Sequence, residues 1–168
     1  MDTPRYEYSR SKIQERIDYL KSLSAPYGLK IRYAIKANPH PEIIKLMTEG
    51  GIHFDASSNY EASELLNQGI SGDKISLSSQ QSPHNLEKLL ESGVLFVATS
   101  LQQIKMFINC PNHPPSVGIR INPDVGYGHS KKTSTGGKNS SFGIWHEYIS
   151  EILEMTSSAG VIINRLHI

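Results

Sequence analysis

The segment Tyr33-Ala34-Ile35-Lys36-Ala37-Asn38-Pro39 lies where an apolar, strand-like run ends and a helix follows. Apolar and polar or small residues alternate over residues 29–35, and this alternation predicts a strand with a buried face. Asn38-Pro39 ends the strand, and Pro41 begins a helix. We therefore expect Lys36 at the carboxyl end of a strand, with its aliphatic stem in apolar surroundings and its amine at the rim.

The position of Lys36 suggests a chemical role. The carboxyl ends of parallel strands are where α/β proteins bind their ligands. A lysine that is partly removed from water loses its proton more readily, and its free amine can attack a carbonyl carbon to form a Schiff base. The alternative is an ordinary lysine at the rim of the sheet.

The rest of the chain alternates predicted helices with predicted strands. A capping box of Ser11 and Gln14 is expected to open the first helix. Strand ends fall near residues 36, 56, 79, 98, 122 and 168, and the first four intervals have the length of one βα unit, about 20 residues. This rhythm predicts a parallel sheet covered by helices, and a (β/α) barrel in particular. A Rossmann fold is disfavoured because no dinucleotide-binding glycine motif follows the first strand. The predicted helices cover residues 11–23, 41–49, 59–68, 82–93, 100–108 and 146–159, and the later strands cover 53–56, 74–79, 94–98, 117–122 and 161–168.

Composition narrows the class of protein. The 168 residues suit one domain, and 17 basic against 16 acidic side chains argue against a protein that binds nucleic acid or a membrane surface. A single cysteine, Cys110, excludes an internal disulfide. With no apolar run long enough to span a bilayer and no secretory signal, we expect a cytoplasmic protein.

Four segments resemble one enzyme family, the fold-type III pyridoxal-phosphate-dependent amino-acid decarboxylases. Residues 33–38 (YAIKAN) resemble the lysine motif of these enzymes, and residues 55–61 match their D-x-x-S-x-x-E pattern. Residues 117–123 resemble their L-R-[VI]-N-P segment, and residues 166–168 look like the start of L-H-x-H-[IV]-G-S. The resemblance implies a TIM barrel of the alanine-racemase-like type, of which about six βα units are present.

The resemblance also implies roles for single residues. Lys36 would be the catalytic residue that carries pyridoxal 5′-phosphate as a Schiff base, and Asp55 would lie close to the cofactor ring. Arg120 would stabilise the phenolate oxygen of the cofactor through a charge-assisted hydrogen bond. Ser58 would lie near the cofactor, and His167 would act at most through another residue.

Each of these roles has a structural alternative. Ser58 and Glu61 have the spacing of a capping box that opens a helix. Arg120 has acidic neighbours with which it could form a structural ion pair, namely Asp55 and Asp124. His167 is equally compatible with an ordinary histidine at the end of a strand.

The long segment of residues 124–141 interrupts the βα rhythm. A polar, glycine-rich loop after a strand is typically functional. The run from His129 to Ile144 resembles diaminopimelate decarboxylase, except that Ser141 stands where that pattern usually has a lysine. The implied reaction is therefore decarboxylation of a basic or dicarboxylic, diaminopimelate-like amino acid. Ornithine, arginine or carboxynorspermidine decarboxylase, and a non-catalytic regulatory relative, are the alternatives.

The resemblance further implies what surrounds residues 1–168. Six strands do not close an eight-stranded barrel, so we expect a partial cofactor-binding barrel domain of a longer enzyme that lacks its carboxyl-terminal β-domain and is inactive alone. The intact enzyme would be a homodimer that acts on a small amino acid. No metal site is expected: a zincin helix would need a histidine at residue 150, which is Ser150. Cys110 does not match the catalytic cysteine of the family, which belongs to the carboxyl-terminal domain.

Overall fold

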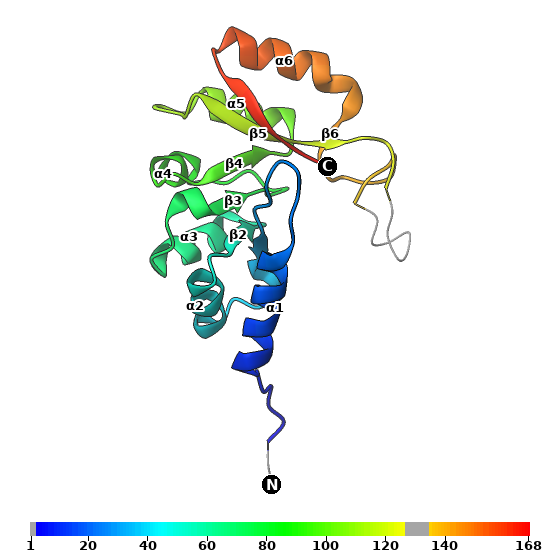
Figure 1. The fold of residues 1–168 in the computed structure, drawn as a ribbon. Helices are drawn as coiled ribbons and strands as arrows, with labels where there is room; N and C mark the ends of the chain where they lie inside the picture. The colour runs from blue at the N-terminus through cyan, green and yellow to red at the C-terminus, as the bar shows by residue number, and fades with distance from the viewer. Residues whose placement is uncertain (1–2, 127–134) are drawn as a thin grey trace. The chain divides into compact units, whose positions relative to one another are not determined.

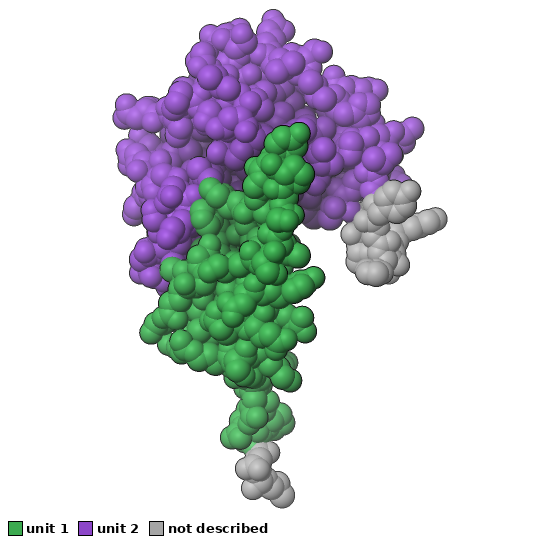
Figure 2. Space-filling view, viewed as in Figure 1, with its two compact units in different colours: residues 1–54 green, residues 55–168 purple. Residues whose placement is uncertain are grey.

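The computed structural model describes residues 3–126 and 135–168 (Figure 1). The chain divides into two compact units, residues 1–54 and residues 55–168 (Figure 2). Each unit is described by itself.

The first unit contains two helices and the start of the sheet. Helix α1 (Arg10–Ser22) is capped by Ser9, whose hydroxyl accepts a hydrogen bond from the Lys12 backbone N–H, so the predicted capping box at Ser11 is wrong. Strand β1 (Arg32–Ala34) leads into a 3₁₀ turn, η1 (Ile35–Ala37), and then into helix α2 (Pro41–Glu49). Strand β2 (His53–Ala56) begins beside β1, since His53 N–H donates to the Ile31 carbonyl oxygen at 3.0 Å.

Helices α1 and α2 approach each other closely at a glycine. A Cβ atom on Gly50 would lie 2.5 Å from Cγ2 of Ile17, so any larger residue would force the Ile17 side chain to move. Ile17 is buried in the core of this unit with three apolar residues of α2, Ile43, Ile44 and Leu46. The amphipathic pattern of α2 therefore explains why it packs against α1.

The second unit repeats helix and strand along the chain. Its elements, in order, are α3 (Asn59–Asn67), η2 (Gly72–Lys74), β3 (Ile75–Leu77), α4 (Leu86–Glu91), β4 (Leu95–Ala98), α5 (Leu101–Ile108), β5 (Ser116–Asn122), β6 (Ile144–Trp145), η3 (His146–Tyr148), α6 (Ile149–Ser158) and β7 (Ile162–His167).

The strand pairs of the second unit are parallel. β3 pairs with β4, β4 pairs with β5, and β5 is flanked by β6 and by β7. The Ser78 N–H donates to the Ala56 carbonyl oxygen at 3.0 Å, which joins the end of β2 to the end of β3. The predicted α/β class with a parallel sheet is confirmed.

The core of the second unit lies between the strands and their helices. Phe96 of β4 and Phe107 of α5 are buried with their rings stacked, 6.2 Å between centroids. Gln103 of α5 is 0% exposed and donates to the Ser79 carbonyl oxygen at 2.8 Å, while its own side-chain oxygen accepts from the Thr99 N–H at 2.8 Å. These bonds fix the carboxyl ends of β3 and β4 to the start of α5.

Several predicted elements differ from the observed ones. Helix α4 begins at Leu86 rather than at Ser82, and the Asn85 side chain donates to Ser63 instead of capping the helix. The two-residue strand β6 was not predicted. Among the described residues, no helix is both long and apolar enough to cross a membrane.

Candidate functional site

Lys36 lies in the 3₁₀ turn η1, directly after strand β1. Asn38 N–H donates to the Ile35 carbonyl oxygen at 3.1 Å, and Tyr33 OH donates to the Asn38 carbonyl oxygen at 3.2 Å. These two bonds close the turn and bury Ile35, which is 1% exposed, while Lys36 is exposed. The predicted position after the first strand is confirmed, but the predicted apolar surroundings of the Lys36 stem are wrong, because the turn directs this residue to solvent.

A second set of predicted residues gathers in the other unit, at the carboxyl ends of β5 and β7. Arg120 and His167 are register partners in this parallel strand pair. The Arg120 Cζ atom lies 4.8 Å from the centre of the Phe142 ring, within the range of a cation–π contact. Asp55, at the end of β2, acts electrostatically on Arg120. We call Asp55, Arg120, Phe142 and His167 the rim cluster.

The charges of the rim cluster follow from burial and from one another. Burial lowers the pKa of Arg120, and the carboxylate of Asp55 opposes this change by stabilising the cation. Burial, and then the positive charge of Arg120, lower the pKa of His167 below its ordinary value of 6.5. At neutral pH the cluster therefore holds a guanidinium cation, a carboxylate and an uncharged imidazole.

Ser58 caps helix α3. Its hydroxyl accepts a hydrogen bond from the Glu61 N–H at 3.2 Å, and the Glu61 carboxylate accepts from the Ser57 N–H at 2.6 Å. The capping interpretation is thus confirmed, with the difference that Glu61 reaches the residue before the cap. A role of Ser58 toward a cofactor stays a prediction.

Asn122, the last residue of β5, is a further functional candidate, which was not predicted as a site residue. It is 2% exposed, and its side-chain oxygen accepts from the N–H groups of Asp124 at 3.2 Å and Gly137 at 2.9 Å. Its side-chain nitrogen donates to the carbonyl oxygens of Gly137 at 3.1 Å and Ser140 at 3.3 Å. The one available signal was an asparagine between a buried strand and a proline.

The long segment after β5 is described only at its two ends. Residues 127–134, including His129, lie outside the described residues. The ends line a pocket of about 240 Å³, together with Ile121, Pro123 and Ile168, at the carboxyl ends of β5 and β7. Ser141 is exposed and accepts a hydrogen bond from the Gln80 side chain at 3.2 Å.

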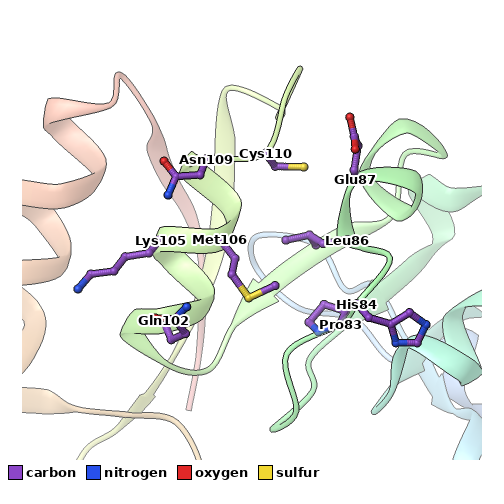
Figure 3. A pocket seen from close by; sticks show the side chains of 9 residues that line it. All are labelled: Pro83, His84, Leu86, Glu87, Gln102, Lys105, Met106, Asn109 and Cys110. Atoms are coloured by element: carbon purple, nitrogen blue, oxygen red, sulfur yellow. The ribbon is translucent and has the colours of Figure 1, made fainter.

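A larger pocket, of about 340 Å³, lies between helices α4 and α5 (Figure 3). None of the predicted site residues lines this pocket, but Cys110 does. Burial raises the pKa of the Cys110 thiol, and the carboxylates of Glu87 and Glu91 raise it further. A thiol that resists ionisation is a poor nucleophile. Figure 3 shows the other residues that line this pocket, which are Pro83, His84, Leu86, Gln102, Lys105, Met106 and Asn109.

No group of three or more histidine, cysteine, aspartate or glutamate side chains in the described part of the chain could hold a metal ion. Each unit therefore has its own candidate functional group: Lys36 in the first unit and the rim cluster in the second.

Comparison with known proteins identifies relatives over nearly the whole chain. Residues 10–168 match the family described as pyridoxal-dependent decarboxylase, pyridoxal binding domain. A diaminopimelate decarboxylase of Streptomyces coelicolor is 36% identical over 98% of this chain and 37% of its own length. A diaminopimelate decarboxylase of Escherichia coli is 29% identical over 90% of this chain and 36% of its own length.

The chain also resembles solved structures of the same enzyme as these relatives. A crystal structure of diaminopimelate decarboxylase superposes with a TM-score of 0.78 and 29% identity, over 94% of this chain and 37% of that one. The Helicobacter pylori diaminopimelate decarboxylase complexed with L-lysine has a TM-score of 0.82 at 23% identity, over 99% of this chain and 44% of that one. These likenesses confirm the predicted (β/α)-barrel class. The chain spans about two fifths of the relatives it matches.

Proposed function

We propose that this chain, which belongs to the pyridoxal-dependent decarboxylase family, binds pyridoxal 5′-phosphate and takes part in the decarboxylation of a basic or dicarboxylic amino acid. The observation that carries the proposal is the match of residues 10–168 to the pyridoxal binding domain of that family. The positions of Lys36 and Arg120 support it, because each stands at or just after the carboxyl end of a strand.

The residues present suit this cofactor. Lys36 offers an exposed primary amine to the aldehyde group of the cofactor, and an amine is the group that reacts with a carbonyl carbon. Arg120 is a fixed, partly buried cation, which suits an anionic oxygen of the cofactor. When bound, pyridoxal phosphate supplies an electron sink for the bond that breaks as carbon dioxide leaves.

The other site residues would support these two. The negative charge of Asp55 favours the charged form of Arg120. His167 stays uncharged beside Arg120, so it adds no second positive charge that would compete for the same oxygen. Ser58 fixes the start of helix α3, and this cap places the hydroxyl directly after the strand that carries Asp55.

Diaminopimelate is the first substrate to test, because the reported relatives are diaminopimelate decarboxylases. Ser141 favours a second candidate, a simple basic amino acid such as ornithine or arginine. A neutral hydroxyl that is bonded to Gln80 offers no positive charge to a distal carboxylate. We further propose that the active form is a homodimer and that residues 1–168 alone, which span about two fifths of the relatives' length, do not catalyse the reaction.

The test joins residues 1–168 to the part of the Streptomyces coelicolor relative that they do not span. Release of carbon dioxide is then measured from diaminopimelate, ornithine, arginine and lysine. We expect release from at least one of them and none from a Lys36→Arg variant, because a guanidinium stays protonated. Lys45→Arg, at an exposed lysine of α2, is the matched control and should stay active. Release that persists in Lys36→Arg would contradict the proposal.

A further inference from the structure

The base of the segment that follows β5 is tied together by one buried side chain. Asn122 bonds to four backbone atoms, two of which belong to Gly137 and one to Ser140, 15 and 18 residues further along the chain. At 2% exposure these bonds are shielded from water, so breaking them leaves polar groups unsatisfied. Asn122 therefore sets where the chain returns to the sheet.

The chain returns directly beside Arg120. Phe142 N–H donates to the Ser140 hydroxyl at 3.3 Å, and Phe142 then lies against the Arg120 guanidinium at 4.8 Å. Gly143 follows with φ +78°, and a Cβ there would lie 3.1 Å from the Arg120 carbonyl oxygen. Strand β6 then pairs with β5, with Asn122 opposite Trp145. The segment that contains Phe142 is thus held on one side by the Asn122 bonds to Gly137 and Ser140, and on the other side by the pairing of β6 with β5.

We propose that Asn122 is a positioning residue: by fixing Gly137 and Ser140 at the end of β5, it places the Phe142 ring over the guanidinium of Arg120 and so orients that cation. This inference rests on the proposed function only in that Arg120 is taken to bind an oxygen of the cofactor. The orientation of Arg120 by Phe142 does not require the cofactor. The ring restricts the rotation of the Arg120 side chain, and it favours the charged form of the guanidinium.

The test follows the Nε–H signal of Arg120 by NMR in the chain without cofactor, with Arg120→Lys to assign it. The aromatic ring should displace this signal from the position of a free arginine. Phe142→Leu should return it to that position, and Phe142→Tyr, which keeps the ring, should not. Asn122→Leu removes all four hydrogen bonds, and Asn122→Asp removes only the two donated bonds. Both should act like Phe142→Leu.

Controls separate this inference from a general loss of structure. Asn164→Asp changes an exposed asparagine of β7, which donates to Ser116, and should leave the Arg120 signal unchanged. The backbone amide signals of β3 and β4 report whether each variant is folded. An Arg120 signal that stays displaced in folded Asn122→Leu and Asn122→Asp would overturn the inference. An Arg120 signal that does not move in Phe142→Leu would also overturn it.

A separate arm judges the proposed function. Pyridoxal 5′-phosphate is titrated into the chain and into its Lys36→Ala variant, and binding is followed by absorbance. Equal behaviour of the two proteins would count against the role of Lys36 but would leave the Asn122 result standing. If positioning matters for the cofactor, Phe142→Leu should weaken binding by about two- to fivefold, the effect expected of one partly exposed cation–π contact.

Discussion

Arg120 and His167 lie opposite each other in the parallel strands β5 and β7, with their side chains on the same face of the sheet. This relationship explains why the histidine is uncharged at neutral pH: burial lowers its pKa first, and the neighbouring cation lowers it further. The same relationship makes the titration of His167 a probe of the rim cluster.

The first prediction concerns this titration. In Arg120→Met the pKa of His167 should rise toward its ordinary value of 6.5, because one of the two causes of its depression is gone. The measurement is the pH dependence of the His167 ring signals by NMR. Lys105→Met removes an exposed cation from α5 and should leave the midpoint unchanged. An unchanged midpoint in Arg120→Met would contradict the electrostatic relationship.

A consequence for stability follows from the direction of this shift. Because the folded pKa of His167 is lower than the unfolded one, the unfolded chain binds a proton first as the pH falls through 6.5. Stability should therefore decrease on acidification below that pH, and His167→Gln should remove this part of the decrease. Urea unfolding at pH 7.5 and pH 5.5 compares the two proteins.

The cap of α3 gives a second prediction. Ser58→Ala removes the hydroxyl that accepts from the Glu61 N–H and should cost about 1 kcal/mol of the free energy of unfolding. Ser100→Ala, at the equivalent cap of α5, should cost a similar amount. Ser58→Asn should restore most of the loss, because asparagine also caps helices. A Ser58→Ala variant as stable as the original protein would contradict the capping role.

Gly143 and Gly160 form a matched pair for the third prediction. Both have positive φ, but a Cβ on Gly160 would meet no atom within 4 Å, whereas a Cβ on Gly143 would lie 3.0 Å from the Asn122 nitrogen. Gly160→Ala should cost about 1–2 kcal/mol for the left-handed backbone alone. Gly143→Ala should cost about 1–3 kcal/mol more for the added crowding, as measured by urea unfolding. Equal costs would mean that the segment beside Arg120 is loosely held.

The fourth prediction concerns Cys110. Because burial and then the carboxylates of Glu87 and Glu91 raise its pKa, its alkylation by iodoacetamide should reach half of its maximum rate at a pH above 9.0. Glu87→Gln removes one negative charge and should lower that midpoint. Glu154→Gln, at an exposed position of α6, should not. A midpoint below 9.0 would contradict the raised pKa of Cys110.

The sequence predicted those parts of the fold that local patterns decide. Helix α2 and strand β2 have their predicted bounds, because proline and glycine mark the ends of the helix and apolar spacing marks its face. Ser58 was recognised as a possible cap from Glu61, one turn away. Strand β6 was missed because two residues show no periodicity, and it forms only by pairing with β5.

The candidate site was predictable in its residues but not in their surroundings. The motifs identified Lys36 and Arg120, whereas the exposure of Lys36 depends on a 3₁₀ turn that the Tyr33 hydroxyl helps to close. The side chain of Asn122 bonds to Gly137 and Ser140, which lie 15 and 18 positions further along the chain, and no local sequence pattern predicts these bonds. Long-range hydrogen bonds of one polar side chain are a tertiary property, which is why they appeared only in the structure.

The measurement that tests the central claim most directly is the identity of the lysine that reacts with the cofactor. Residues 1–168, joined to the remainder of the Streptomyces coelicolor relative, are incubated with pyridoxal 5′-phosphate, reduced with borohydride, digested and mapped by mass spectrometry. We expect the pyridoxyl group on the peptide that contains Lys36. The exposed lysines Lys30 and Lys45 serve as controls for non-specific labelling. A pyridoxyl group on Lys30 or Lys45, with Lys36 unmodified, would contradict the proposed role of Lys36.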